Sequence, residues 1–142
     1  MGSLSEGTVF KTLDEVERKL SGNELMIADA SGGLCIAGVF GGINSGVTAT
    51  TKNIFLESAY FDSVLVRKAA RFHGLHTDSS FRFERGTDPE MTITALQKAV
   101  TLITDIAGGK AETAFVDIYP VKVERKLIDL SFTYLNTLAG NN

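Results

Sequence analysis

Glu57 is the residue whose place in the sequence points most directly to chemistry. It follows the apolar run at 54–56, so its carboxylate leaves an apolar segment close to the core. A buried carboxylate without a partner is costly. Two explanations stay open: Glu57 forms a structural ion pair with Arg67 or Arg71, or it awaits a hydroxyl or an amine on a ligand.

A glycine-rich turn, GGINSG at 41–46, precedes this acid. Gly41 and Gly42 lack a Cβ, so a ligand can lie against the main chain and its N–H groups. A plain connector between two elements is the alternative. The turn lacks the Gly-Lys-Ser/Thr ending of a nucleotide phosphate loop and does not open a helix with a dinucleotide fingerprint.

Basic residues gather after Glu57, although the net charge of the chain is −3. That balance argues against a generally basic nucleic-acid coat, but a local basic face suits RNA. The candidates for it are Arg67, Lys68, Arg71, Arg82 and Arg85. Phe81 and Phe83 alternate with two of these arginines, and half-buried strand packing is favoured over base stacking there. The hydroxyls at 77–80 suit turn and cap bonds.

The remaining polar residues predict no metal site. His73 and His76 lie three apart, but no carboxylate or thiol stands at metal-ligand spacing from them. Cys35 is the single cysteine, so an internal disulfide is impossible and a reducing, cytoplasmic compartment is expected. No apolar run approaches the roughly 18–20 residues of a membrane span, and the start MGSLSEG is unlike a signal peptide.

Short apolar runs predict strands in the first part of the chain. Residues 8–20 predict two strands joined at 13–15. Residues 25–30 and 34–40 predict a hairpin with a Ser31-Gly32-Gly33 connector. The second run is apolar almost throughout, which predicts a central strand buried on both faces. Residues 53–57 predict a further strand that ends on Glu57.

Two helices are expected after these strands. The first begins at 62 or 63 and ends near 73, where Gly74 is a stop signal. The second runs from 89 to 107, because Asp88 is a capping residue and Pro89 favours the first turn. Apolar residues at helical spacing are expected to form its buried stripe, namely Leu96, Ala99, Val100, Ile103 and Ile106.

The last residues predict the start of another unit. A strand is expected at 114–119, a second at 126–130 and the first turn of a helix at 134–138, with a domain boundary near Pro120. Strands followed by helices indicate an α+β fold in which a mixed or antiparallel sheet packs with two main helices. The 142 residues suit one domain plus a fragment of the next.

Several blocks in this order closely resemble one family: FGGINSG, IFLES, RKAARFHGLHTDSSFRFERGTDP and DIAGG. That family is the beta subunit of bacterial phenylalanyl-tRNA synthetase, in the part that edits mischarged tRNA. The likeness covers about residues 25–119. It implies a tRNA-editing domain at 1–120, without its N-terminal part, and the opening of the following domain at 121–142.

The resemblance also implies roles for single residues. The family's editing glycine falls on Gly41, beside Gly42, its pocket glutamate on Glu57, and the threonine of its LHTDAS motif on Thr77. Ser79 replaces the alanine of that motif and makes the pocket wall more polar. The family's Gln-Pro-x-His histidine falls before the first residue of this chain, so the resemblance assigns no hydrolytic base here.

The implied activity is hydrolysis of tyrosine wrongly attached to tRNA(Phe). An apolar pocket built for phenylalanine rejects the extra hydroxyl only about 100-fold, so a second site that demands the hydroxyl is useful. A carboxylate such as Glu57 accepts that hydrogen bond, whereas phenylalanine leaves it unpaired at a cost of roughly 1–3 kcal/mol. The N–H groups of the glycine turn are expected to stabilise the oxyanion as water attacks.

For the whole enzyme, the resemblance implies an α2β2 assembly in which a catalytic alpha subunit uses ATP and Mg²⁺ to charge tRNA(Phe). No cofactor is expected in this chain itself. Two alternatives stay open: a scaffold module that bridges subunits or holds tRNA, and a free-standing deacylase. The scaffold predicts an ion-paired Glu57 and no cleft beside Gly41, whereas the free-standing enzyme requires a complete domain.

Overall fold

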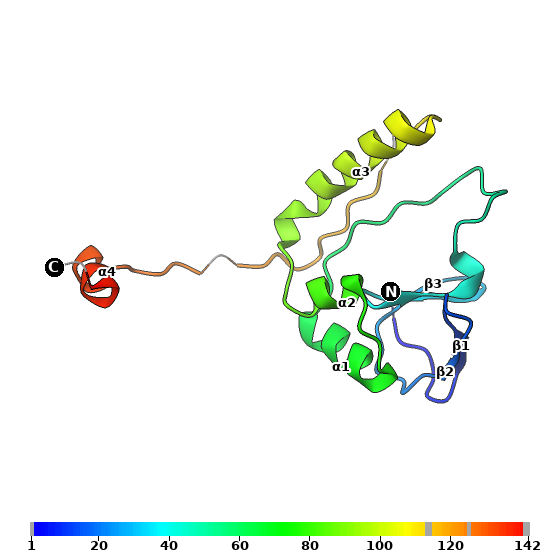
Figure 1. Cartoon of the computed structure of the whole chain (residues 1–142), viewed down its shortest axis with the longest axis horizontal. Coiled ribbons are helices and arrows are strands. Elements are labelled where there is room, and N and C mark those ends of the chain that lie inside the picture. Colours follow the sequence, from blue (N-terminus) through cyan, green and yellow to red (C-terminus); the bar gives the residue numbers. More distant parts are fainter. Residues whose placement is uncertain (1, 113–114, 125, 141–142) are drawn as a thin grey trace.

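The computed structural model describes residues 2–112, 115–124 and 126–140. Two antiparallel sheets occupy the first part: β1 (Val9–Lys11) with β2 (Glu17–Lys19), and β3 (Met26–Asp29), β4 (Gly32–Ile36) and β5 (Phe40–Gly41) in that order. The helices are α1 (Ser63–His73), α2 (Asp78–Phe83), α3 (Thr92–Ala107) and α4 (Phe132–Ala139), with short 3-10 turns η1 (Ile43–Ser45) and η2 (Pro89–Met91). Figure 1 shows this arrangement, which confirms the α+β class.

Local signals place both predicted hairpins, but Gly32 and Gly33, expected in the connector of the second, belong to β4. In the β3–β4 turn, the Asp29 carboxylate accepts hydrogen bonds from the backbone N–H groups of Ser31 and Gly32. β4 lies between β3 and β5, so its central position is confirmed, although it ends at Ile36. Only Ile36 of this strand is fully buried, so the predicted burial on both faces is wrong. The chain then turns at Gly38, whose φ is 68°, and a Cβ there would lie 3.0 Å from Val66 Cγ2 of α1.

Capping residues fix α1 and α2. The Asp62 side chain accepts from the first N–H groups of α1, and Gly74 ends the helix in the left-handed conformation, both as predicted. In α2 the Thr77 hydroxyl accepts from Ser80 N–H, while the Ser80 hydroxyl accepts from Thr77 N–H, which is a capping box. This box makes residues 78–83 helical, so the strand packing expected for Phe81 and Phe83 is wrong.

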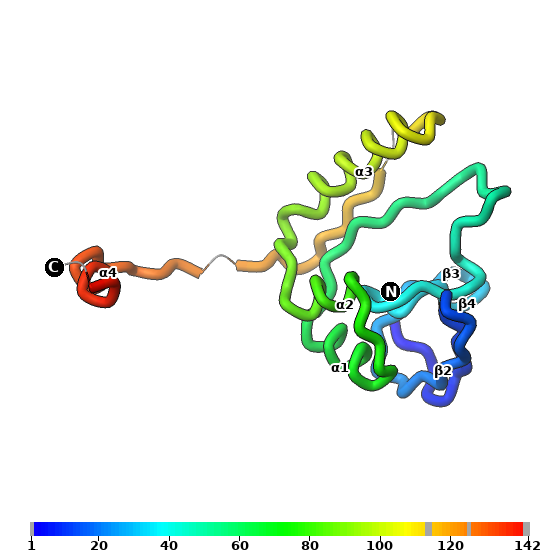
Figure 2. Tube along the Cα trace, in the orientation of Figure 1, coloured from blue at the N-terminus to red at the C-terminus, as the bar shows by residue number. Residues whose placement is uncertain are grey.

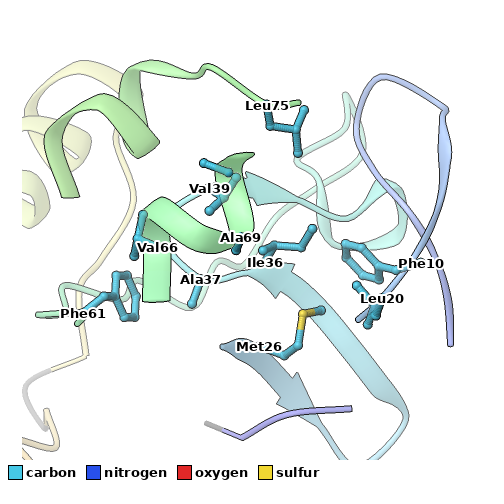
Figure 3. Packing of buried hydrophobic residues seen from close by; sticks show 11 residues of the cluster. Phe10, Leu20, Met26, Ile36, Ala37, Val39, Phe61, Val66, Ala69 and Leu75 are labelled. Carbon is cyan, nitrogen blue, oxygen red and sulfur yellow. The ribbon is translucent and has the colours of Figure 1, made fainter. Parts of the chain in front are cut away.

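The hydrophobic core lies between the strands and α1, as Figure 3 shows. Helix α1 contributes its buried face, and Phe61 packs on Phe83 of α2 with ring centroids 4.9 Å apart. The buried apolar residues are Phe10, Leu20, Met26, Ile36, Ala37, Val39, Phe61, Val66, Ala69, Ala70 and Leu75. This core joins elements from Phe10 to Leu75 and leaves α3 outside it.

The strand expected at 53–57 is wrong. Residues 51–62 form neither helix nor strand, and Phe55 is 97% exposed. Figure 2 shows the chain leaving the three-stranded sheet after η1 and returning to α1 as a long loop. An apolar run becomes a strand only where a neighbouring strand pairs with its backbone, and this segment has no such pairing in the described part of the chain.

The end of the chain departs further from expectation. Helix α3 spans the predicted range after η2, but its stripe is only half-buried and Ile106 is 82% exposed, so the buried stripe is wrong. Residues 115–119 and 126–130 form no strand, and Ala114 lies outside the described residues. Where the first turn of a helix was expected at 134–138, the structure has the two-turn helix α4. Among the described residues, no helix is long and apolar enough to cross a membrane.

Candidate substrate pocket

Four segments that are distant in sequence line an open cavity of about 600 Å³. They are the β3–β4 hairpin with its following turn, the loop at 57–61, helix α2, and the stretch from 87 to 95 that leads into α3. Much of the wall is apolar, formed by Ile27, Ala59, Phe61, Phe83, Met91 and Ala95. A hydrogen bond of 2.7 Å from the Ser58 hydroxyl to the Thr92 carbonyl ties two of these segments together.

Glu57 lines this cavity, but the residue is exposed to solvent, so the expectation of a carboxylate buried close to the core is wrong. Desolvation by the surrounding protein raises the pKa of its carboxyl above the ordinary value of 4.5. Among the described residues Glu57 forms no ion pair, so the alternative in which it pairs with Arg67 or Arg71 is not found. The Arg67 guanidinium instead donates to the Glu84 carbonyl at 2.6 Å. A carboxylate beside an apolar hollow is therefore available to a ligand.

Cys35 supplies a second polar group to the same cavity. Its sulfur lies within hydrogen-bonding distance of the Ile36 and Phe40 carbonyls, at 3.3 and 3.4 Å. Burial, and then the negative charge of Glu57, raises the pKa of the thiol to about 11. The thiol is therefore protonated at neutral pH, and Cys35 acts as a weakly polar wall residue and not as a nucleophile.

Helix α2 brings Ser79 and Phe83 to the cavity, and Thr77 holds this helix in place. The Thr77 hydroxyl donates to the Val39 carbonyl at 2.7 Å and accepts from Ser80 N–H at 3.0 Å. It thus links the first turn of α2 to the backbone beyond β4. Thr77 is not among the residues that line the cavity, so its place in the structure is that of a positioning residue.

Gly41 and Gly42 lie outside the cavity lining. A Cβ at Gly42 would lie 2.7 Å from Phe10 Cζ, and one at Gly41 would lie 3.0 Å from Leu13 Cδ1. The Gly42 N–H already donates to the Leu34 carbonyl at 2.8 Å. It is therefore not free to stabilise an oxyanion in this structure, and a close approach between β5 and the first hairpin explains why Gly42 lacks a side chain.

The predicted basic residues are all exposed, but two of them are held by the protein. Arg67 is bonded to the Glu84 carbonyl, and the Arg85 guanidinium lies 3.5 Å from the centre of the Phe81 ring. The side chains of Lys68, Arg71 and Arg82 remain as exposed positive charges on α1 and α2. The surface of α1 and α2 therefore offers RNA three unengaged positive charges, fewer than the five that the sequence predicts.

The two histidines do not meet at a metal site. His73 Nε2 bonds to the buried carboxylate of Glu24, whereas His76 is exposed. Among the described residues, no group of three or more His, Cys, Asp or Glu side chains is placed to hold a metal ion.

Comparison with known proteins identifies the domain. A family model described as the B3/4 domain matches residues 2–108. The chain belongs to the B3/4 domain family. The phenylalanine--tRNA ligase beta subunit of Porphyromonas gingivalis is 53% identical to it over 139 residues, which are 97% of this chain and 17% of that relative. The subunit of the same name from Bacteroides thetaiotaomicron is 49% identical over 138 residues, again 97% and 17%.

A more distant relative carries the same name. The phenylalanine--tRNA ligase beta subunit of Geobacter metallireducens is 42% identical to this chain over 134 residues, which are 94% of this chain and 17% of that relative. The resemblance to the beta subunit of phenylalanyl-tRNA synthetase is thereby confirmed. The B3/4 chain described here spans about 17% of the length of the relatives that it matches.

Within this B3/4 domain, the residues singled out from the sequence separate into three groups. Glu57 and Ser79 line the cavity, Thr77 supports its wall, and Gly41 and Gly42 pack against the first hairpin, away from the cavity. Sequence reasoning missed Cys35 and Thr87 as residues of the cavity lining. Cys35 could have been found from its position on the predicted central strand, because alternate residues of a strand face opposite sides, so that one set can line a cavity. Nothing in the sequence singles out Thr87.

Proposed function

We propose that this chain is part of the editing site of a phenylalanyl-tRNA synthetase beta subunit, where tyrosine wrongly attached to tRNA(Phe) is removed by ester hydrolysis. In this proposal the whole enzyme pairs the subunit with a catalytic alpha subunit in an α2β2 assembly. It charges tRNA(Phe) with phenylalanine in the cytoplasm and uses ATP and Mg²⁺ for that step. Those reactants bind elsewhere in the enzyme, and the present residues act on the aminoacyl group.

The observation that carries the proposal is the unpaired Glu57 carboxylate beside an apolar cavity. The rings of Phe61 and Phe83 offer an apolar surface on which a tyrosine ring packs. The phenolic O–H of tyrosine donates to Glu57, which is an acceptor that phenylalanine leaves without a partner. Glu57 is exposed in the free protein, so the difference arises when the bound aminoacyl group displaces water from the carboxylate. An unmade hydrogen bond there then costs roughly 1–3 kcal/mol, and this difference selects tyrosine.

Glu57 is a recognition group in this scheme and not the general base. Its carboxylate is engaged by the phenol at the far end of the substrate from the ester. The water that attacks the ester, and the donors that stabilise the oxyanion, come from outside the cavity lining described here. The roles predicted for Gly41, Gly42 and Thr77 at the ester stay predictions. Thr77 supports helix α2, which lines the cavity, whereas the two glycines pack against the first hairpin.

The exposed cations Lys68, Arg71 and Arg82 are proposed to face the tRNA backbone. The scaffold alternative predicts an ion-paired Glu57 and no cleft beside Gly41. The described residues supply no ion pair for Glu57, but Gly41 does lie outside the cavity lining, so only the first of these two observations speaks against the scaffold. The proposal therefore retains the basic face for tRNA and assigns the cavity to the aminoacyl group.

The test is a deacylation assay with the full-length protein that carries this chain, in its native assembly, on Tyr-tRNA(Phe) and Phe-tRNA(Phe). Wild-type protein is expected to hydrolyse the tyrosyl ester with a clear preference, and Glu57→Ala to lose that preference. Glu17→Ala is the matched control, because Glu17 is an exposed acid on β2 and lies outside the cavity lining. A Glu57→Ala protein that still prefers the tyrosyl ester shows that the proposal is wrong.

A further inference from the structure

Phe81 is a large apolar side chain that the fold leaves on the surface of α2. The strand packing favoured for it is wrong, because residues 78–83 are helical, and base stacking is the alternative that the sequence leaves open. Two positions further along the helix, Phe83 packs on Phe61 and lines the cavity, whereas Phe81 is 58% exposed. Residues two apart in an α-helix point about 200° apart, so Phe81 points away from the cavity wall that Phe83 forms.

The Arg85 side chain is fixed against this exposed ring. Its guanidinium carbon lies 3.5 Å from the centre of the Phe81 ring, which is a stacking distance. Its Nη1 atom donates to the Phe81 carbonyl at 2.6 Å and to Glu84 Oε1 at 3.1 Å. Both Phe81 and Arg85 nevertheless stay exposed to solvent. The Phe81–Arg85 stack is therefore an ordered, accessible pair of flat groups, and a partner that binds it need not order it first.

Further cations flank the Phe81–Arg85 stack. Arg82 directly follows Phe81 and is exposed. The Arg67 guanidinium donates to the Glu84 carbonyl at 2.6 Å, which holds α1 beside the end of α2. Arg71 lies one helical turn from Arg67 on α1 and is also exposed.

The acids of this region do not cancel its positive charge. Between residues 63 and 85 the chain has five Lys and Arg residues and two acids, Asp78 and Glu84. The Glu84 carboxylate is already paired with Arg85. An exposed ring amid excess positive charge suits a partner that offers both flat apolar faces and negative charge. Unpaired nucleotides offer both, because their bases stack on aromatic rings and guanidinium groups while their phosphates attract Lys and Arg.

We infer that the Phe81–Arg85 stack is a platform for an unpaired base at the 3′ end of the tRNA. This inference rests on the proposed function and extends it from the aminoacyl group to the nucleotides that precede it. An α-helix with its side chains is about 10 Å across, roughly the length of three stacked nucleotides at about 3.4 Å each. A strand whose tyrosyl group lies in the cavity therefore reaches the outer side of α2 within a few nucleotides. One base stacks there, and Arg82 lies beside the phosphates.

The test compares Phe81→Leu with Phe72→Leu in the full-length protein, in its native assembly. Leucine keeps an apolar side chain and removes the aromatic ring in each case. Phe72 is the matched control, because it is 61% exposed on α1 and packs edge-on against the His73 ring instead of against a guanidinium. We expect Phe81→Leu to raise KM for Tyr-tRNA(Phe) by about tenfold, which is within the range for one base stacked on an aromatic side chain. We expect kcat to stay the same, and Phe72→Leu to behave like wild type.

A truncated substrate separates the platform from the cavity. Tyrosyl-adenosine carries the ester but lacks the preceding nucleotides, so wild type and both variants are expected to hydrolyse it at equal rates. Arg85→Lys keeps the positive charge but removes the flat guanidinium. It is expected to raise KM for Tyr-tRNA(Phe) in the same way as Phe81→Leu and to leave hydrolysis of tyrosyl-adenosine unchanged.

Three results overturn the inference while the proposed function stands. The first is an equal KM for Tyr-tRNA(Phe) in Phe81→Leu and Phe72→Leu. The second is an equal loss of Phe81→Leu activity on tyrosyl-adenosine, which assigns Phe81 to the shape of the cavity. The third is a smaller native mass of Phe81→Leu in light scattering, which assigns the ring to a protein contact. If wild type does not hydrolyse Tyr-tRNA(Phe), the proposed function fails and the inference fails with it.

Discussion

His73 Nε2 lies 2.9 Å from Glu24 Oε1, and these two side chains are only 4% and 2% exposed. The pair joins the last turn of α1 to the segment that follows β2. Both Glu24 oxygens also accept hydrogen bonds from the Ser21 N–H, at 2.9 and 3.0 Å. Helix α1, which contributes Val66, Ala69 and Ala70 to the core, is thus anchored to the segment between β2 and β3 by a buried polar contact.

Breaking this contact is expected to destabilise the fold. Glu24→Ala leaves the His73 ring and the Ser21 N–H without their buried acceptor, and an unsatisfied buried polar group costs about 1–3 kcal/mol. The free energy of unfolding, measured by urea denaturation, checks this value. Glu17→Ala on the exposed face of β2 is the control, and an equal effect of the two changes contradicts a special role for the pair.

The same residue predicts how stability depends on pH. Burial opposes ionisation of Glu24, but the hydrogen bonds from Ser21 and His73 outweigh it and hold the pKa of the carboxyl below 4.5. A carboxyl with a lowered pKa binds fewer protons in the folded than in the unfolded chain. It therefore stabilises the fold above pH 4.5, and this stability is lost as the pH falls through the folded pKa. Urea midpoints at a series of pH values should fall less steeply below pH 4.5 in Glu24→Gln than in wild type.

Gly42 is expected to tolerate a side chain less well than Gly41. An added Cβ at Gly42 meets the Phe10 ring at 2.7 Å and the Leu34 carbonyl at 2.8 Å, whereas at Gly41 it meets the end of the flexible Leu13 side chain. We expect Gly42→Ala to lower the free energy of unfolding by about 1–3 kcal/mol, the usual cost of overpacking. Gly41→Ala, as the paired variant, is expected to lower it less. The reverse order disproves the packing explanation.

Local signals account for the parts of the fold that the sequence predicts well. Asp62 and Gly74 bound α1, and Asp29 with Gly32 forms the hairpin turn, because each interaction lies within a few residues. The predictions of a strand at 53–57 and of a buried stripe on α3 are wrong for a common reason. Their burial depends on partners distant in sequence, and no local pattern reveals whether such a partner is present.

The residues of the candidate site also divide into those that the sequence indicates and those that only the folded structure reveals. Glu57 is recognisable because an acid directly follows an apolar run, and Ser79 through a motif. The unpaired state of the Thr87 hydroxyl and the neighbourhood of Cys35 and Glu57 appear only once β4, α2 and the two loops meet in space. These properties belong to the assembled cavity and have no sequence pattern of their own.

Thr77 is expected to support the cavity from outside. Thr77→Val removes both the cap of α2 and the bond to the Val39 carbonyl, whereas Thr77→Ser keeps them. Loss of a cap alone costs about 1 kcal/mol, so Thr77→Val should lower the Tm and the rate of Tyr-tRNA(Phe) hydrolysis together. Thermal unfolding and the deacylation assay measure the two effects. If activity falls with no change in Tm, Thr77 contacts substrate, and the positioning role is wrong.

The charge of Glu57 is expected to slow the reaction of the Cys35 thiol. Burial and this carboxylate raise the pKa of the thiol to about 11, so only a small fraction is thiolate at pH 8. Glu57→Gln removes the negative charge, which lowers the pKa of Cys35 and raises its rate of alkylation by iodoacetamide at fixed pH. Glu17→Gln is the control and is expected to react like wild type. Equal rates for all three proteins show that the two groups do not interact.

The most direct test of the account is the affinity of the full-length protein for non-hydrolysable amide analogues of tyrosyl- and phenylalanyl-adenosine, measured by calorimetry. The account predicts that wild type binds the tyrosyl analogue at least about tenfold more tightly, and that Glu57→Ala binds the two analogues alike. Equal affinity of wild type for both analogues contradicts the claim that Glu57 reads the phenolic hydroxyl.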